Sequence, residues 1–291
     1  MITLRALLLV AGFGLFVSPA LSQTVIEPCP AGTPAAKPAI TAKPASPVSP
    51  AARATQTTVD AGIPDDPAVE NMLAPYSEKV RALSVVIGRL DAPLKKDSVG
   101  AGSLGNFVTD AVRAQAIAKL GKPVTLVMMN SGGLRKNEIS PGELRASDIF
   151  ELLPFENALV ALEINGTQLK KLLEITPRDA QAGARVQFKW NDQNRAEFLS
   201  GKLVDENGRE QEIDPQKTYT IVTIDYLVRL GSGSYALLQE AKSSTPLNIT
   251  LRDAVIDYVK AETAAGRDIR SRIDNRYVQV GPDRKRVEEP R

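Results

Sequence analysis

Hydrophobic and polar residues follow two periods along the chain from residue 60 onward, one typical of helices and one typical of strands. Apolar residues at three- and four-residue steps predict a helix that opens at Pro64–Pro67 and further helices over 107–117, 147–153, 167–174 and 251–259. Continuous or alternating apolar runs predict strands over 85–87, 124–129, 159–164, 186–190 and 219–224. Helices and strands do not alternate regularly, so the pattern favours an α+β fold: a single domain with a mixed β-sheet flanked by helices.

Polar and glycine-containing stretches predict where these elements begin and end. Ser103-Leu-Gly-Asn106 offers a polar cap for the helix over 107–117. Asn165-Gly166 predicts a tight turn and Asn207-Gly208 a β-hairpin. Gly231–Tyr235 predicts a flexible loop that ends in an aromatic ring.

The first 22 residues predict a secretory signal peptide. Arg5 supplies a positive start, residues 6–17 form a short apolar core, and small residues precede a cleavage site near Ser22–Gln23. The apolar core is shorter than the roughly 20 residues that a membrane span requires. We therefore expect export to the periplasm or secretion, with no membrane span after cleavage.

Composition divides the rest of the chain into three parts. Residues 23–58 are rich in Ala and Pro and carry almost no bulky apolar side chains, so they predict a disordered tether. Residues 59–276 carry the periodic pattern and predict one folded domain. Residues 277–291 predict a charged tail.

Charge and residue usage exclude several kinds of function. The net charge is +2 with acids and bases interspersed, whereas a nucleic-acid polymer would need a concentrated basic face. Cys29 is the one cysteine, which excludes an internal disulfide and suits a bacterial periplasm. The chain contains no histidine, so chemistry that depends on histidine is excluded.

A candidate binding loop follows the most apolar predicted strand. Asn130–Arg135 reads Asn-Ser-Gly-Gly-Leu-Arg and combines an amide side chain, backbone N–H groups and a guanidinium. Gly132 and Gly133 permit a ligand to approach the backbone closely, and Arg135 suits bidentate recognition of phosphate or carboxylate. The alternative is a glycine turn beside a solvated arginine.

Five motifs occur in order along the predicted domain and together resemble one family. They are Leu104–Ala111, Asn130–Arg135, Ser140–Leu144, Leu153–Asn157 and Leu162–Leu169. In this order they resemble the C-terminal domain of the 5′-nucleotidase family. Asp225–Leu227 followed by Gly231–Tyr235 resembles the last loop of that domain, and the helix near Pro64 resembles the helix that links the two domains of the family.

The resemblance implies a role for each candidate site residue. In the family this domain stacks the base of a nucleotide between two aromatic rings and anchors the ligand with Asn and Arg. By position, the resemblance makes Phe155 the first ring, Tyr235 the second ring and Asn157 a contact to the base. It places Asn130 and Arg135 on the sugar or phosphate side.

Two motifs depart from the family pattern. Val99–Ser103 lacks the Arg and Glu that family members carry before the Gly-Asn pair, which removes one phosphate contact. The last loop lacks its acidic residue, for which Glu240 is a candidate substitute. Both departures are expected to change nucleotide specificity. They change the aromatic pair less, because Phe155 and Tyr235 are both present.

The family's catalytic half has no counterpart in the sequence. That half is a calcineurin-like metallophosphatase domain that binds two divalent metal ions, partly through histidine, and the segment before residue 60 is too short to contain it. We therefore expect no cofactor in this chain. The expected ligand is a nucleotide, a nucleoside or a similar small molecule, and a separately encoded calcineurin-like phosphatase chain is a candidate partner.

Three functions fit these observations. The chain is an exported binding module linked to nucleotide catabolism, or a hydrolase that acts with a separate metallophosphatase subunit, or a scaffold whose ligand site has decayed. Stand-alone catalysis is disfavoured, because Ser131 lacks a histidine base. Asp110, Asp148 and Asp225 are better explained as surface or helix-start acids than as a metal site.

Overall fold

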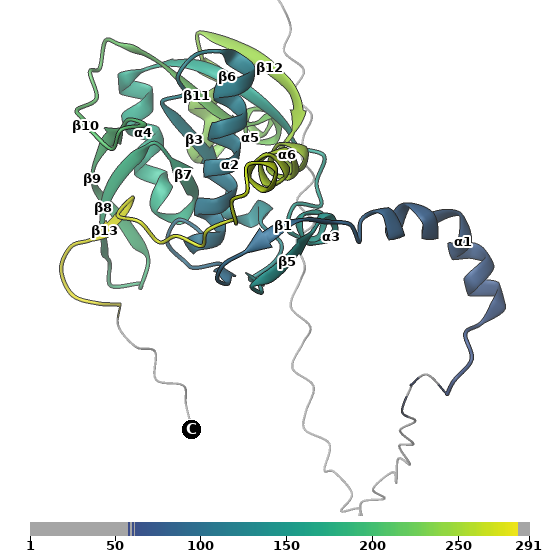
Figure 1. The fold of residues 1–291 in the computed structure, drawn as a ribbon. Helices are drawn as coiled ribbons and strands as arrows, with labels where there is room; N and C mark the ends of the chain where they lie inside the picture. Colours follow the sequence, from purple (N-terminus) through teal and green to yellow (C-terminus); the bar gives the residue numbers. More distant parts are fainter. Residues whose placement is uncertain (1–57, 59, 61, 285–291) are drawn as a thin grey trace, which may run out of the picture. The chain divides into compact units, whose positions relative to one another are not determined.

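A five-stranded mixed sheet forms the centre of the fold in the computed structural model, which describes residues 58, 60 and 62–284 (Figure 1). β11 runs parallel to β3, and the other neighbouring strands pair antiparallel. The sheet confirms the predicted α+β fold with a mixed sheet. In spatial order its strands are β12 (Ser243–Thr250), β6 (Ala158–Asn165), β11 (Thr218–Ile224), β3 (Leu126–Met129) and β7 (Ala180–Ala182).

A second, four-stranded sheet and two short strand pairs complete the β-structure. The predicted hairpin at Asn207-Gly208 is confirmed, because it joins β9 to β10 with Gly208 at φ +77°. The four-stranded sheet has the order β10 (Glu210–Gln211), β9 (Ala196–Val204), β8 (Ala184–Trp190) and β13 (Tyr277–Gln279). The short pairs are β1 (Val86–Leu90) with β5 (Gly142–Arg145) and β2 (Leu94–Lys95) with β4 (Glu138–Ile139).

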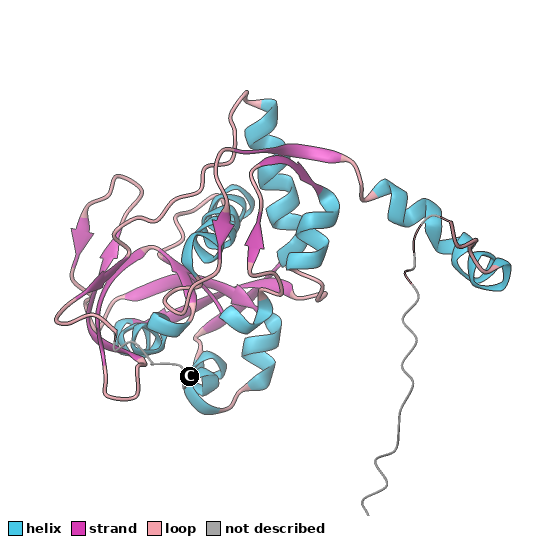
Figure 2. Ribbon diagram, turned by 90° about the horizontal axis from the view of Figure 1, so that it is seen from below, coloured by secondary structure: helices cyan, strands magenta, loops and turns pink. Residues whose placement is uncertain are grey.

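Helices pack against these sheets (Figure 2). α2 contacts α6 and the strands β3 and β7, while α4 contacts β6 and β11 of one sheet and β9 of the other. None of the helices in the described part is long and apolar enough to cross a membrane. The helices are α1 (Pro67–Ala82), α2 (Gly102–Leu120), α3 (Ala146–Leu152), α4 (Gly166–Ile175), α5 (Asp225–Leu230) and α6 (Leu251–Ala264), with 3-10 turns η1 (Ser131–Gly133), η2 (Thr176–Arg178) and η3 (Gly233–Glu240).

The predicted strand over 124–129 is confirmed as the best-buried strand of the central sheet. All four residues of β3 are buried, and Leu126 and Val127 pair with β11. A strand covered on both faces needs apolar side chains on both, which explains the continuous apolar run.

Two predictions at the starts of helices are wrong, for different reasons. α2 begins at Gly102 rather than at 107, and Asn106 is an interior residue that donates to the Arg272 carbonyl at 2.9 Å. Asn165-Gly166 is not a tight turn: Asn165 caps α4, and its side chain accepts from the N–H of Gln168 at 2.9 Å. The Asn106 contact is with a residue far away along the chain, whereas Asn165 forms a local capping box with Gln168 three residues later.

The signal peptide and tether predictions lie outside the described residues, apart from the last positions of the tether. The predicted end of the domain at 276 is too early, because Tyr277–Gln279 forms β13, parallel to β8. The Tyr277 hydroxyl donates to the Asp179 carbonyl at 2.6 Å, which ties this strand to the body of the domain.

Arg276 anchors the same C-terminal segment through a charged network. Its side chain is only 11% exposed and donates to both carboxylate oxygens of Asp110 at 3.0 and 2.9 Å and to Asp274 at 2.7 Å. Burial by itself lowers the pKa of Arg276, but the two carboxylates outweigh it and raise that pKa above its usual value. The guanidinium therefore stays charged and holds the segment against α2.

We expect Arg276→Ala to lower the free energy of unfolding by about 3 kcal/mol, because it leaves a partly buried carboxylate without its cation. The measurement is urea unfolding followed by circular dichroism. Arg89→Ala is the matched control, since Arg89 and Asp268 are 67% and 54% exposed and 3.9 Å apart. Such an exposed pair contributes at most about 1 kcal/mol, and equal losses in the two variants would contradict the anchoring role.

Candidate functional site

Three strand ends meet at one edge of the central sheet and create a pocket. β11 is parallel to β3 and antiparallel to β6, so the carboxyl ends of β3 and β11 lie beside the amino end of β6. The segments attached to these ends line a pocket of about 350 Å³. The lining residues are Asn130, Gly132, Gly133, Arg135, Phe155, Asn157 and Tyr226.

Six of the seven residues predicted from the sequence therefore come together, although they lie in two separate segments of the chain. Asn130–Arg135 follows β3 directly. Phe155 and Asn157 belong to residues 153–157, called here the β6-entry loop, between α3 and β6. The seventh predicted residue, Tyr235, does not line this pocket, and Tyr226 lines it instead.

The floor of the pocket is the 3-10 turn η1. The N–H of Gly133 donates to the Asn130 carbonyl at 3.0 Å, which closes the turn. A Cβ at Gly132 or Gly133 would lie 3.5 or 3.4 Å from the Asn130 side chain, which is an ordinary van der Waals contact, so the Asn130 amide packs directly against this turn. The Asn130 Oδ1 atom is buried and has no hydrogen-bond donor among the described residues. A buried acceptor without a donor is costly, so Asn130 suits a ligand that supplies one.

The rim of the pocket carries positive charge. Arg135 is exposed, its Nη1 donates to the Gly132 carbonyl at 3.3 Å, and its Cζ lies 5.9 Å from the centre of the Phe155 ring. Lys96 is close by and donates to the Leu134 carbonyl at 2.7 Å. Burial, and then the charge of Arg135, lower the pKa of Lys96. This concentration of positive charge favours an anionic group at the arginine side.

Two exposed aromatic rings flank the pocket. Phe155 is 49% exposed and Tyr226 is 45% exposed, although large apolar groups are usually covered. Phe188 and Trp190 form the one ring-to-ring contact in the described part of the chain, so Phe155 and Tyr226 do not stack on each other. Each ring therefore has exposed area that a ligand could contact, although Arg135 lies over the Phe155 ring.

Arg252 on α6 fixes the β6-entry loop from the protein interior. Its Nη1 donates to the carbonyls of Leu153 and Pro154 at 3.3 and 3.4 Å, and its Nη2 is paired with Glu156. Its Cζ also lies 4.1 Å from the centre of the Phe150 ring. Arg252 is only 6% exposed, so these contacts hold the loop in one conformation and leave the Phe155 ring outside.

Asp225 fixes the second ring relative to the same loop. It is the first residue of α5, and its Oδ1 accepts from the N–H of Ala158 at 3.1 Å. Its other oxygen pairs with Arg229 at 3.1 Å. Because Tyr226 follows Asp225 and Asn157 precedes Ala158, this hydrogen bond joins the two halves of the pocket.

Tyr235 has a different environment. It is half-buried, and its hydroxyl donates to Asp179 Oδ2 at 2.6 Å, while Asp179 Oδ1 accepts from the N–H of Ser131 at 3.1 Å. Burial raises the pKa of Asp179, and burial together with that carboxyl raises the pKa of Tyr235. Tyr235 thus ties the 231–235 loop to the back of η1. The sequence signal for Tyr226 was an aromatic residue two positions after the predicted strand over 219–224.

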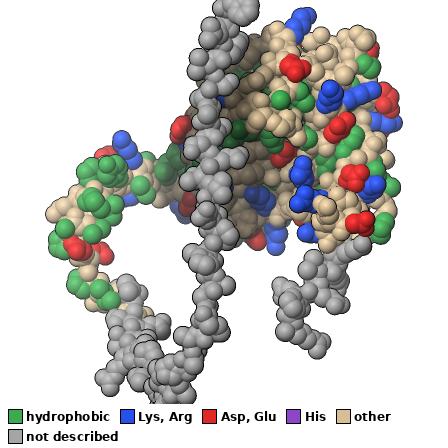
Figure 3. Space-filling view, turned by 180° about the vertical axis from the view of Figure 1, so that it is seen from behind, with side chains coloured by type: hydrophobic (Ala, Val, Ile, Leu, Met, Phe, Trp, Pro, Cys, Tyr) green, Lys and Arg blue, Asp and Glu red, His purple; other side chains and the backbone are tan. Residues whose placement is uncertain are grey.

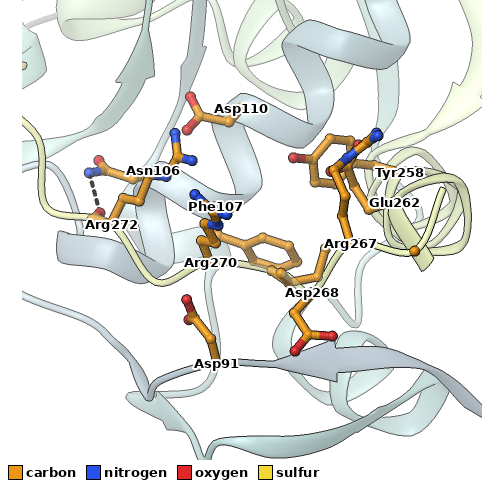
Figure 4. A pocket seen from close by; sticks show the side chains of 12 residues that line it. Asp91, Asn106, Phe107, Asp110, Tyr258, Glu262, Arg267, Asp268, Arg270 and Arg272 are labelled. Atoms are coloured by element: carbon orange, nitrogen blue, oxygen red, sulfur yellow. Dashed lines mark hydrogen bonds and ion pairs between the residues drawn. The ribbon is translucent and has the colours of Figure 1, made fainter.

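A larger cavity of about 720 Å³ lies between α2, α6 and the segment 266–272 (Figure 4). None of the predicted site residues lines it. Its carboxylates already have partners: Asp110 pairs with Arg276, Glu262 pairs with Arg267 at 2.7 Å, and Asp91 accepts from the N–H of Ser271 at 2.8 Å. Within the described residues no group of three or more Asp, Glu, His or Cys could hold a metal ion. The smaller pocket therefore remains the better candidate for a ligand site.

Comparison with known proteins identifies the domain. The family model for the 5′-nucleotidase C-terminal domain matches residues 84–240, more than half of the chain. The chain is 25% identical over 229 residues to an apyrase of Tabanus yao, and 29% identical over 153 residues to a probable 5′-nucleotidase of Treponema pallidum. These matches cover 69% and 47% of this chain but only 40% and 26% of the two relatives.

Solved structures agree on the fold. A 5′-nucleotidase precursor of Thermus thermophilus superposes with a TM-score of 0.61 at 21% identity, over 76% of this chain and 44% of that one. The NAD nucleotidase of Haemophilus influenzae superposes with a TM-score of 0.55 at 17% identity, over 74% of this chain and 42% of that one. The chain belongs to the 5′-nucleotidase family and carries that family's C-terminal domain.

Proposed function

We propose that the chain binds a nucleotide or nucleoside in the pocket at the ends of β3, β6 and β11, with the base between Phe155 and Tyr226. The observation that carries this proposal is the pair of aromatic rings, each about half exposed, on opposite segments of a pocket lined by amide groups. Stacking on an aromatic side chain contributes about 1–3 kcal/mol per base and tolerates different bases.

The polar groups of the pocket fit the remaining parts of such a ligand. Asn157 offers an amide to the edge of the base. The buried Oδ1 of Asn130 suits a ligand donor such as a ribose hydroxyl. Arg135 and the nearby Lys96 suit a phosphate, since guanidinium groups bind phosphate oxygens in pairs. The ligand class is thus a purine or pyrimidine nucleotide or nucleoside.

We also propose that the chain holds this ligand without hydrolysing it alone. It has no histidine, and the described residues offer no cluster of metal-binding side chains. The chain spans less than half the length of the family members described above, and the proposed partner is a separately encoded calcineurin-like phosphatase. The charged and apolar pattern of residues 1–22 supports export to the periplasm or secretion.

We predict that Phe155→Ala and Tyr226→Ala each weaken adenosine binding about 10- to 100-fold, which corresponds to the loss of one stacking contact. Isothermal titration calorimetry is the suitable measurement, because the one tryptophan, Trp190, lies in β8 and does not line the pocket. Tyr76→Ala on α1 removes a more exposed ring elsewhere and should leave the affinity unchanged. Wild-type affinity in both pocket variants would refute the stacking model.

Arg135→Ala should weaken AMP binding at least about tenfold but change adenosine binding much less, because only AMP carries the phosphate. The difference between the two ligands should shrink as ionic strength rises, since salt screens the charge. Calorimetry at two salt concentrations checks this, with Arg89→Ala as the control for a surface arginine. An equal loss for both ligands would instead indicate a structural role for Arg135.

The purified chain, loaded with Mg²⁺, Mn²⁺ or Ca²⁺, should release no phosphate from AMP above the buffer control in a colorimetric assay. Phosphate release that Arg135→Ala abolishes would show that the chain is a hydrolase by itself. Nucleotide binding without phosphate release would support the proposal that a separate hydrolase subunit consumes the bound nucleotide.

A further inference from the structure

One buried carboxylate lies behind the nucleotide pocket without a basic partner. On the surface, acidic and basic side chains are interspersed, as Figure 3 shows for one face of the molecule. Asp179 is different, because it is only 8% exposed and forms no ion pair within the described part of the chain. A carboxylate in such a place keeps its charge only if hydrogen bonds to it offset the cost of burial.

The two oxygens of Asp179 connect the floor of the pocket to η3. Oδ1 accepts from the N–H of Ser131 at 3.1 Å, and Ser131 is the first residue of η1, which forms the floor. Oδ2 accepts from the hydroxyl of Tyr235 at 2.6 Å, and Tyr235 lies in η3. Each oxygen therefore has one donor, and both donors meet a charged acceptor while the carboxyl is ionised.

η3 extends this connection to the second aromatic ring of the pocket. It packs against α5, which carries Tyr226, and Gln239 of η3 donates to the Val228 carbonyl at 3.2 Å. Gly231 joins the two elements with φ +51°, and a Cβ there would lie 2.0 Å from the Gln239 side chain. Because α5 and η3 are packed this closely, the hydrogen bond of Tyr235 also restrains the helix that holds Tyr226.

Asp179 can exchange a proton with solvent although it is buried. It lines a separate pocket of about 380 Å³ together with Arg178 and Tyr235. Burial raises the pKa of Asp179, while the hydrogen bonds from Tyr235 and Ser131 and the charge of Arg178 act in the opposite direction. Tyr277 also faces it, with its hydroxyl on the Asp179 backbone carbonyl. Burial outweighs the other effects, so the carboxyl takes up a proton at higher pH than an ordinary aspartate.

Protonation changes both hydrogen bonds of the carboxyl. Since Oδ1 faces an N–H donor, the proton goes to Oδ2, which then donates to the Tyr235 oxygen instead of accepting from it. The bond from Ser131 loses its charged acceptor, and hydrogen bonds to a charged group are roughly twice as strong as neutral ones. The floor and the ring are therefore held most firmly while Asp179 is ionised. A pocket held in its binding arrangement loses less entropy when a ligand enters.

We propose that Asp179 is a positioning residue of the nucleotide pocket, and that its ionised carboxylate raises the affinity by holding η1 and η3 together. Asp179 does not line the pocket and acts through Ser131 and Tyr235. This inference rests on the proposed nucleotide site. Affinity is full while Asp179 is ionised and falls as the pH falls and the carboxyl takes up its proton. By linkage, a bound ligand makes Asp179 harder to protonate by the same factor.

Calorimetric titration of the full chain with adenosine, from acid to neutral pH, tests the proposal. Adenosine is the probe because it lacks the phosphate group, which titrates at about pH 6 in monoesters. The wild type should bind about three- to tenfold more weakly at acid pH. Asp179→Asn, which mimics the protonated carboxyl, should show the weaker affinity at every pH. Tyr235→Phe should move the midpoint to higher pH, because the Tyr235 hydrogen bond lowers the pKa of Asp179.

Two variants control for the loss of a carboxylate and of a hydroxyl elsewhere. Asp91 accepts from the N–H of Ser271 at 2.8 Å but does not line the pocket, so Asp91→Asn should keep the wild-type pH profile. Tyr76→Phe on α1 should keep it too. The amide resonance of Ser131 in an NMR titration reports the carboxyl without any ligand. It should titrate in the wild type and stay constant in Asp179→Asn.

An affinity for adenosine that does not change with pH, or a pH dependence that persists in Asp179→Asn, would overturn the proposal and leave the nucleotide site in place. Failure of the wild type to bind adenosine at any pH would instead overturn the proposed function and this inference together. If Asp179→Asn does not fold, the wild-type profile, the Ser131 resonance and Tyr235→Phe decide, and an unshifted midpoint in Tyr235→Phe contradicts the role of Asp179.

Discussion

The pairing of β11 with β3 on one side and β6 on the other is the constraint on which the site depends. Val222 pairs with Val127 in the parallel direction, and Ile224 pairs with Leu159 in the antiparallel direction. This mixed arrangement alone brings two carboxyl ends and one amino end to the same edge of the sheet. Loops that are separated along the chain then share one pocket.

Buried polar contacts hold those loops so that their aromatic rings stay outside. Arg252, Asp225 and Asp179 lie behind the pocket and bind backbone groups of the β6-entry loop, the start of β6 and η1. Such groups stabilise one conformation, because each would lose a hydrogen bond if the loop moved. Phe155 and Tyr226 therefore keep exposed faces without the loops collapsing onto them.

The pattern of neighbouring residues correctly predicted the elements whose formation depends on neighbouring residues. The apolar run of β3 and the hairpin at Asn207-Gly208 depend on residues that are near one another along the chain, and both are present. Contacts between distant residues produced two of the errors. The Asn106 side chain is used by Arg272, 166 residues away, and the Tyr235 hydroxyl is used by Asp179, 56 residues away. No periodicity in the sequence carries that information.

The sequence by itself determined the α+β class, the family, and six of the residues that line the pocket, because motifs and hydrophobic periods report local backbone and burial requirements. Only the tertiary structure decided that Tyr226 rather than Tyr235 lines the pocket, since that depends on which side chain a distant carboxylate engages. It also decided that the described residues do not bury the apolar side of α1, because amphipathic spacing does not specify what covers that side.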